Sequence, residues 1–151
     1  MAERPKEMDE FLGESRRMAR VSTTNPDTSS HIVPLCYKFI LEEGTFFFST
    51  GVDSVTVKNL NQNPAITVCI DDDEFPFRAV IVEGTAEVSE TLGTDHEGLK
   101  TVIDQFFGPD MWESYKDGPV AKKMRVRLNV IPKKWKFWDY RRQLNGSVKT
   151  A

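Results

Sequence analysis

The stretch TFFFSTGVDSVTVKNL, residues 45–60, contains the strand, turn and helix on which the fold prediction rests. TFFFST (45–50) is apolar at consecutive positions, so both faces of this strand are expected to be buried. Asp53 or Ser54 can cap a short helix over 54–62, which Asn63-Pro64 ends. The N-terminus of a helix offers unpaired backbone N–H groups and can bind an anion, with Lys58 one turn beyond Ser54. These residues alone favour an ordinary capped turn over a phosphate site, because capping serines and aspartates are common.

Outward from this unit, apolar periodicity predicts further strands at 17–24, 31–41, 65–70, 78–90, 122–132 and 133–140. Gly84 is expected to form a bend or bulge, and Pro34 to lie at an edge, at a bulge or against a ligand. Helices are expected at 6–15, from a capping box at 94–97 to Phe107, and at 110–118. In the strand at 122–132 we expect Met124, Val126, Leu128 and Val130 to face inward and Arg125, Arg127 and Asn129 to face outward. The pattern predicts a mainly β, antiparallel meander or Greek-key barrel with helices in its connections.

Composition limits the function classes. The 151 residues fit one domain spanning 1–151, with frayed ends at 1–8 and 141–151. A net charge of -3 argues against a dedicated nucleic-acid binder. The chain has no apolar run long enough to span a membrane, and its charged start lacks a signal core, so we expect a cytoplasmic protein without a membrane partner. Cys36 and Cys69 are expected to be buried free thiols.

Other candidate sites have a simpler structural explanation beside the functional one. KKWKFWDYRR (133–142) interleaves basic and aromatic residues, as a stacking surface for a flat ring does, but also suits a barrel strand with a lysine-rich edge. The acidic run at 71–74 could bind a metal, although a solvated turn is the favoured interpretation. His31 and His96 are solitary, and no hydrolytic triad or glycine-rich nucleotide loop is present. Any chemistry would therefore come from a bound cofactor.

The order of these segments resembles the pyridoxamine 5′-phosphate oxidase-like flavin-binding split barrels, a group that includes deazaflavin-dependent reductases. The resemblance covers about residues 9–140 and is carried by RMARVSTTNPD, HIVPLCY, FFFSTGVDS, VKNLNQNPAITVCIDDD, RAVIVEGTAEV and WKFWDY. It implies a six-stranded antiparallel split β-barrel of Greek-key type. It also implies a homodimer with flavins in grooves between the subunits.

The resemblance also implies positions for the cofactor. The backbone at Val33, Pro34 and Leu35 would line the isoalloxazine ring, and Ser49 and Thr50 would contact the ribityl-phosphate part. The helix start, with Ser54, Val55, Thr56 and Lys58, would hold the phosphate. Trp138 or Trp135 would lie near the ring, from either subunit, and Arg78 lies beside the position where the oxidase has a flavin-facing glutamine (Ala79 here).

Two departures from the family pattern change the functional expectation. Many members carry an Arg-Lys pair where this chain has Val55 and Thr56, so Lys58, Arg20 or Arg17 would have to compensate. The substrate-binding pattern of the oxidase itself is also missing at the C-terminal end, so pyridoxamine phosphate oxidation is not expected.

The main hypothesis is an FMN-dependent oxidoreductase acting on a small-molecule substrate, with catalytic side chains unknown and no metal. The alternatives are a deazaflavin-dependent reductase and a non-catalytic protein that binds a flavin or another flat ligand. A third alternative, nucleic-acid binding through 133–142, is disfavoured by the acidity of the chain.

Overall fold

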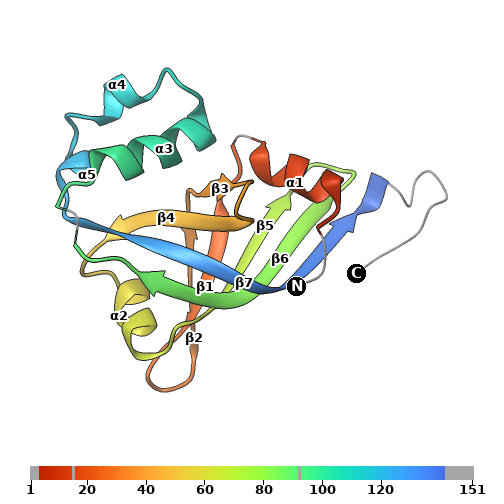
Figure 1. Ribbon diagram of the computed structural model, residues 1–151, viewed down its shortest axis with the longest axis horizontal. Helices are drawn as coiled ribbons and strands as arrows, with labels where there is room; N and C mark the ends of the chain where they lie inside the picture. The colour runs from red at the N-terminus through yellow and green to blue at the C-terminus, as the bar shows by residue number, and fades with distance from the viewer. Residues whose placement is uncertain (1–3, 15, 92, 142–151) are drawn as a thin grey trace.

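A single curled antiparallel sheet forms the body of the protein. The structure is a computed structural model that describes residues 4–14, 16–91 and 93–141. Its seven strands are hydrogen-bonded in the order β2-β1-β5-β6-β7-β4-β3 and form a half-barrel (Figure 1). The strands are β1 (Ala19–Thr24), β2 (Ser30–Leu35), β3 (Lys38–Ile40), β4 (Thr45–Gly51), β5 (Ala65–Asp72), β6 (Arg78–Val88) and β7 (Arg125–Asp139). The neighbours β1–β5 and β4–β7 are not consecutive in the chain, which excludes a simple meander.

The six strands that the resemblance implied are one too few, and the stretch predicted as one strand at 31–41 makes two. β2 and β3 are separated by Cys36 and Tyr37, and they form opposite edges of the sheet. Tyr37 is buried, and its hydroxyl donates a hydrogen bond to the carbonyl of Leu12 at 2.9 Å. A two-residue connection can join opposite edges only if the sheet curls until those edges approach each other at this corner.

The strands predicted at 122–132 and 133–140 are one continuous strand, β7, of 15 residues. Proline cannot donate to a ladder, so Pro132 needs a local accommodation within this strand. In the structure Pro132 lies opposite Gly84, where the β6–β7 register shifts. The bulge predicted at Gly84 is therefore confirmed, and it absorbs the proline. A Cβ atom at position 84 would collide with the carbonyl oxygen of Ile131, so glycine is required there.

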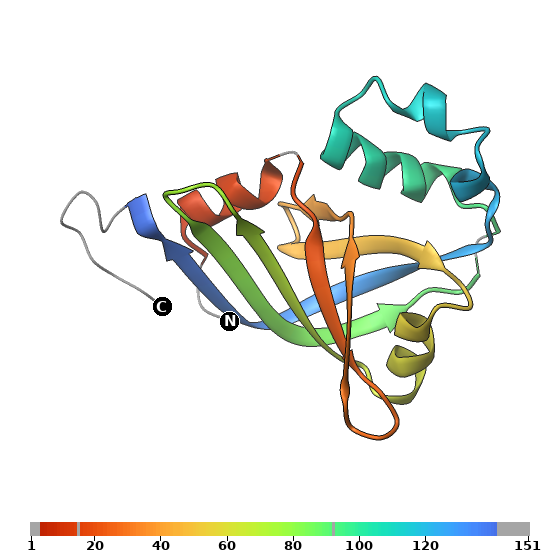
Figure 2. The same cartoon turned by 180° about the vertical axis from the view of Figure 1, so that it is seen from behind.

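The barrel core follows the predicted alternation in most places. β4 is buried on both faces, and Val126, Leu128 and Val130 of β7 point into the main core. One expectation for the start of β7 is wrong, because Met124 precedes the strand and is 56% exposed. Arg125 faces outward as expected, but only 8% of its surface is accessible. Arg125 is buried because helices cover the outer face of the sheet at this end (Figure 2).

The helices are α1 (Lys6–Gly13), α2 (Val55–Gln62), α3 (His96–Phe107), α4 (Trp112–Tyr115) and α5 (Pro119–Lys122). α1 buries Met8, Phe11 and Leu12, so the expected fraying does not extend through residue 8, and α2 is capped by Ser54 as expected. The capping box predicted at 94–97 is wrong, because Asp95 is the N-cap of α3 and accepts a hydrogen bond from Gly98 N–H. α3, α4 and α5 form a layer beside β4 (Figure 1). Within the described ranges, none of these helices has the length and apolar character needed to cross a bilayer.

Candidate functional site

A pocket of about 380 Å³ lies between α3 and the outer side of the sheet. We call it the α3 pocket. β2, β4 and β7 each contribute residues to its floor, and α3 forms its roof with an apolar face. The lining residues are Met18, Pro34, Leu35, Cys36, Ser49, Leu99, Val102, Ile103, Phe106, Phe107, Tyr115, Val120 and Arg125. Segments distant in the sequence therefore meet here around one mainly apolar space.

Among the described residues, Arg125 is the one cation that lines the α3 pocket. Its Nε donates to Ser49 Oγ at 2.8 Å, and its two terminal nitrogens donate to the carbonyls of Ser49 and Val120, both at 3.1 Å. Burial lowers the pKa of Arg125, and the nearby Asp95 charge opposes this effect. A guanidinium remains protonated in a protein, so this side chain places a buried positive charge at the pocket wall.

The other polar side chains that line the α3 pocket are neutral and can donate hydrogen bonds. The Ser49 hydroxyl lies on the outer face of β4, and the Cys36 thiol follows β2. Burial raises the pKa of Cys36, so the thiol stays protonated. No carboxylate or imidazole is among the lining residues of the described chain. The site therefore offers donors and apolar walls, which suit a flat ligand with acceptor or anionic groups.

A second, more polar pocket of about 460 Å³ lies beside α2. We call it the α2 pocket, and it is lined by Asn25, Pro26, Asp27, Val55, Lys58, Asn59 and Gln62. Ser54 accepts a hydrogen bond from Val57 N–H at 3.2 Å, so its side chain serves as the helix cap. Among these lining residues Lys58 is the single cation, and Asp27 is a carboxylate that opposes an anion.

The cofactor-binding residues predicted from the sequence do not lie in one site in the structure. Pro34, Leu35 and Ser49 line the α3 pocket, whereas Val55 and Lys58 line the α2 pocket. The remaining residues of β2, β4 and α2 lie elsewhere: Val33 packs against the main core, Thr50 alternates with Ser49 and is buried, Ser54 is the cap, and Thr56 is buried in α2. The resemblance thus identified one strand end from each of β2 and β4 that meet in a pocket.

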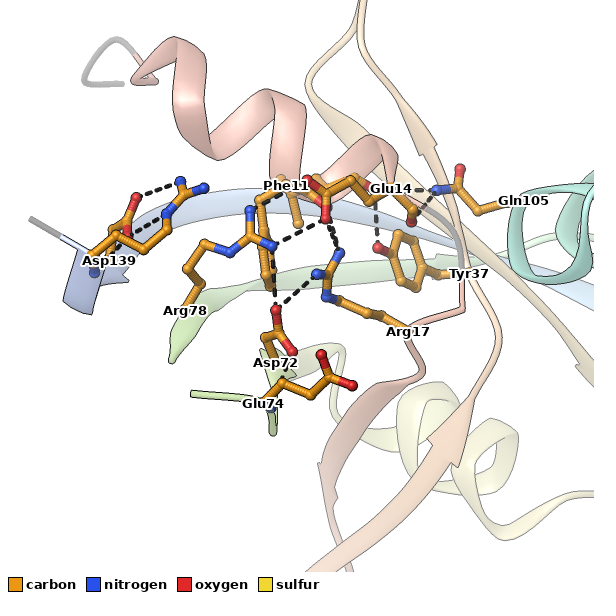
Figure 3. Close-up of polar contacts among 11 residues, drawn as sticks. Phe11, Glu14, Arg17, Tyr37, Asp72, Glu74, Arg78, Gln105 and Asp139 are labelled. Atoms are coloured by element: carbon orange, nitrogen blue, oxygen red, sulfur yellow. Dashed lines mark hydrogen bonds and ion pairs between the residues drawn. The ribbon is translucent and has the colours of Figure 1, made fainter. Parts of the chain in front are cut away.

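Arg78 and Trp138 lie at the other end of the sheet. Arg78 joins an ion-pair network with Glu14, Arg17 and Asp72 (Figure 3), in which its NH2 group is 3.2 Å from both Glu14 Oε2 and Asp72 Oδ2. Trp138 pairs with Ala79, and the thirteen residue steps of β7 from Arg125 to Trp138 span on the order of 40 Å along the strand. Neither residue lines the α3 pocket or the α2 pocket of its own chain.

The arginines expected to replace the missing phosphate clamp have other partners. Arg17 pairs with Glu14 at 2.6 Å and with Asp72 at 3.0 Å, and Arg20 pairs with Asp71 at 2.8 Å. Asp71 and Asp72 are the first residues of the acidic run at 71–74, and both belong to β5. No group of three metal-ligating side chains occurs in residues 4–14, 16–91 and 93–141.

Sequence reasoning missed Arg125, Cys36 and the α3 wall of the pocket. The alternation along β7 distinguishes two faces but does not say which segment covers the outer one. One signal was available: the apolar face of α3, with Leu99, Val102 and Ile103, needs a partner surface. In the structure Leu99 and Ile103 pack in a cluster separate from the main core, beside the outer side of the sheet.

Comparison with known proteins agrees with this architecture. A family model described as pyridoxamine 5′-phosphate oxidase matches residues 5–139. No protein with a curated description matches the chain.

Similar solved structures share the fold. They include the conserved hypothetical protein Rv2991 from Mycobacterium tuberculosis, with a TM-score of 0.75 and 24% identity over 100% of this chain and 92% of that one. An F420 reductase has a TM-score of 0.65 and 23% identity over 83% of this chain and 94% of its own. A Clostridium acetobutylicum protein of the pyridoxinephosphate oxidase family, related to general stress protein 26, has a TM-score of 0.64 and 18% identity over 89% and 87%. At these identities the likeness concerns the fold alone.

The family model spans nearly all of the described residues, and the curled antiparallel sheet with its short helices is the split-barrel architecture. That family includes FMN oxidases and F420-dependent reductases. The chain belongs to the pyridoxamine 5′-phosphate oxidase-like split-barrel family.

Proposed function

We propose that this chain is an oxidoreductase that works through a bound flavin-type cofactor, either FMN or the deazaflavin F420. The observation that supports the proposal is the α3 pocket, in which Pro34 and Leu35 from β2 meet Ser49 from β4 beneath an apolar helix face. Flat ring cofactors bind in such mostly apolar pockets with a few polar groups at the edge. The proposal does not extend to pyridoxamine phosphate oxidation.

In this proposal the protein supplies position and environment for the ring. The bound ring would provide the redox chemistry by accepting or donating a hydride or electrons. Pro34 and Leu35 would pack along it, and Pro34 fits this role because it has no N–H group that would be left unpaired. Ser49 would offer a hydroxyl, and the α3 side chains would exclude water. No side-chain nucleophile is required, which agrees with the absence of a catalytic triad in the sequence.

The residues that would hold the cofactor phosphate, in the α2 pocket, favour F420 over FMN. In the described part of the chain, Lys58 is the single cation that lines the α2 pocket, and Asp27 lies in the same lining. A phosphomonoester such as that of FMN carries close to two negative charges at neutral pH, whereas the phosphodiester of F420 carries one. One cation beside a helix N-terminus compensates one charge better than two. On the phosphate group alone F420 is therefore favoured, and its acidic tail would bind basic residues outside the α2 pocket. The sequence pattern alone had placed FMN first.

We also propose that the active unit is a homodimer. Ile32 of β2 and Met124 before β7 are apolar and exposed, at 64% and 56% of their surface, and both are sequence neighbours of residues in the α3 pocket. Covering them with a second copy would remove apolar surface from water and could complete the pockets. Light scattering at micromolar concentration tests this expectation, and a strict monomer would contradict it.

Cofactor binding is tested by titrating the desalted protein with F420 and, separately, with FMN. We expect F420 to be retained through a second desalting step with a perturbed absorption spectrum, and FMN to bind at least about tenfold more weakly. Tighter binding of FMN would reverse the order of the two cofactors. Release of both at micromolar concentration would contradict the proposed function and leave the non-catalytic binding protein as the better hypothesis.

A further inference from the structure

Arg125 is a buried cation whose hydrogen-bond partners are all uncharged. Its three hydrogen bonds go to one hydroxyl and two backbone carbonyls. A guanidinium has five N–H donors, so two remain beyond these bonds. Within the described part of the chain, none of the ion pairs shorter than 4.0 Å includes Arg125.

The neighbouring outward-facing arginine of β7 shows what a paired arrangement looks like. Arg127 donates to Asp95 through two bonds of 2.8 Å, one to each carboxylate oxygen. Asp95 is thereby committed to Arg127 and to its capping bond with Gly98. It influences Arg125 only through its charge at longer range. Two arginines on the same face of one strand thus differ in whether a carboxylate neutralises them.

A buried charge without a counter-charge is costly, on the order of several kcal/mol for an ion in a protein interior. The cost falls when an anion binds, because the guanidinium fork makes two parallel bonds to a carboxylate. The pocket itself supplies no such anion, since its polar lining consists of Arg125, Ser49, Cys36 and the phenol of Tyr115. The missing counter-charge would come with the ligand.

The shape of the site restricts the ligand further. Most lining residues are apolar, and a volume of about 380 Å³ is near the lower end for small-molecule pockets. A single cation matches a single negative charge, and an apolar wall disfavours a second one. The fitting ligand is a small flat apolar molecule with one carboxylate.

We propose that the α3 pocket binds small apolar carboxylic acids, whose carboxylate pairs with Arg125 while the hydrocarbon part packs beneath α3. That these acids are substrates rests on the proposed function, because only a bound cofactor would make the ligand a substrate. That they bind rests on the pocket alone. Pro34 and Leu35 line the same pocket, so a ligand held by Arg125 would contact these residues or a ring bound along them.

The test compares two probes that differ only in charge, 2-naphthoate and 2-naphthamide. Calorimetric titration of the full-length protein, without added cofactor, should show that the naphthoate binds at least about tenfold more tightly, which equals about 1.4 kcal/mol. In Arg125→Met this preference should disappear, while the naphthamide still binds with an affinity within about threefold of the unmodified protein. Retained naphthamide binding shows that the variant still forms the pocket.

Two further variants test whether the probes bind in the α3 pocket and whether the charge of residue 125 causes the preference. Val102→Phe should weaken both probes, because Val102 lines the pocket from α3. Arg125→Lys should keep part of the preference, since it keeps the charge and loses the fork. Equal affinities for the two probes, a preference that persists in Arg125→Met, or no binding of either probe to the unmodified protein would each overturn the proposal.

Retention of F420 or FMN is measured by absorption on the same preparation, which separates the two proposals. Charge-selective naphthoate binding in a protein that retains neither cofactor would refute the proposed function and support the carboxylate site. Cofactor retention without charge selectivity would support the proposed function and refute the carboxylate site.

Discussion

Two regions of this molecule hold partly or fully buried arginines, and these arginines are paired in opposite ways. In the network between α1, β5 and β6 (Figure 3), the Arg17 and Arg78 side chains are each 13% exposed, and both contact the carboxylates of Glu14 and Asp72 at 2.6–3.2 Å. Both guanidinium groups also lie over the Phe11 ring, at 4.2 and 4.9 Å from its centroid. In the α3 pocket, Arg125 is buried and forms no ion pair with a carboxylate of the described residues. The first arrangement stabilises the fold, whereas the second leaves a charge for a ligand to neutralise.

The difference shows how a buried cation can be interpreted. Arg78 was a candidate cofactor ligand because of its position in the family pattern, but its hydrogen bonds are directed to Glu14 and Asp72. Arg125 was expected only to face outward from the barrel, and it lines a pocket there. A cation with its counter-charges in place is a structural element, and one without them indicates a binding site. Variants of each type should therefore affect different properties.

The largest effect is expected from Arg127→Met, the paired neighbour of Arg125 on β7. Asp95 is 5% exposed, and this substitution would leave its carboxylate with the capping bond alone. Breaking a buried pair on one side costs several kcal/mol, and we expect a loss of about 3 kcal/mol because Arg127 is itself partly exposed. Urea unfolding followed by circular dichroism measures it. A loss below about 1 kcal/mol would show that this pair does not stabilise the fold.

Asp72→Asn should have the next largest effect, about 2 kcal/mol of unfolding free energy. The substitution removes the charge that Arg17 and Arg78 share and leaves them with Glu14, whose side chain is more exposed. The matched control is Asp71→Asn, whose pair with Arg20 is exposed and should contribute less than about 1 kcal/mol. Equal losses in the two variants would remove the distinction between a buried network and a surface ion pair.

Acid should destabilise the protein by protonating the paired carboxylates of Asp72 and Asp95. Burial raises the pKa of Asp72, but the Glu74 backbone N–H and the Arg17 and Arg78 guanidinium groups outweigh it and hold this pKa below its ordinary value. The hydrogen bond from Arg127 is the main cause of the lowered pKa of Asp95. A lowered folded-state pKa gives stability that is present above about pH 4 and is lost as pH falls further. Unfolding free energy measured between pH 6 and about pH 3 should fall less steeply in Asp72→Asn, and parallel curves would contradict this account.

Lys58→Ala should weaken cofactor binding by about tenfold, or about 1.4 kcal/mol, without changing stability, because Lys58 is exposed on α2. The measurement is the F420 titration described above, with Lys122→Ala on α5 as a charge-matched control away from the α2 pocket. Unchanged affinity in Lys58→Ala would show that the α2 pocket does not hold the phosphate.

The smallest effect on stability is expected from Arg125→Met. The variant loses three hydrogen bonds to neutral oxygens and also removes a buried unpaired charge, so the two contributions oppose each other. We expect a change in unfolding free energy within about 1 kcal/mol, in contrast to Arg127→Met. A loss as large as that of Arg127→Met would mean that Arg125 is mainly structural, and the contrast between the two arginines would fail.

Features that depend on local sequence could be predicted from this chain. The three phenylalanines of β4 required burial on both faces, Ser54 and Asn63-Pro64 set the limits of α2, and the alternation along β7 directed Val126, Leu128 and Val130 inward. The order of such segments was enough to indicate the split-barrel family. Strand period and capping act over a few residues, which is why one sequence can reveal them.

Only the tertiary structure decided where the pocket lies and which charges remain unpaired. The break at Cys36 and Tyr37 exists because β2 and β3 take opposite edges of a curled sheet, a fact that no local pattern contains. Arg125 and Arg127 have the same residue type, strand and face, yet Asp95 reaches only one of them. Ion pairing and burial depend on which distant segment covers a face, and here that segment is α3. The sequence therefore determined the barrel, whereas the packing of α3 against β4 and β7 decided its candidate binding site.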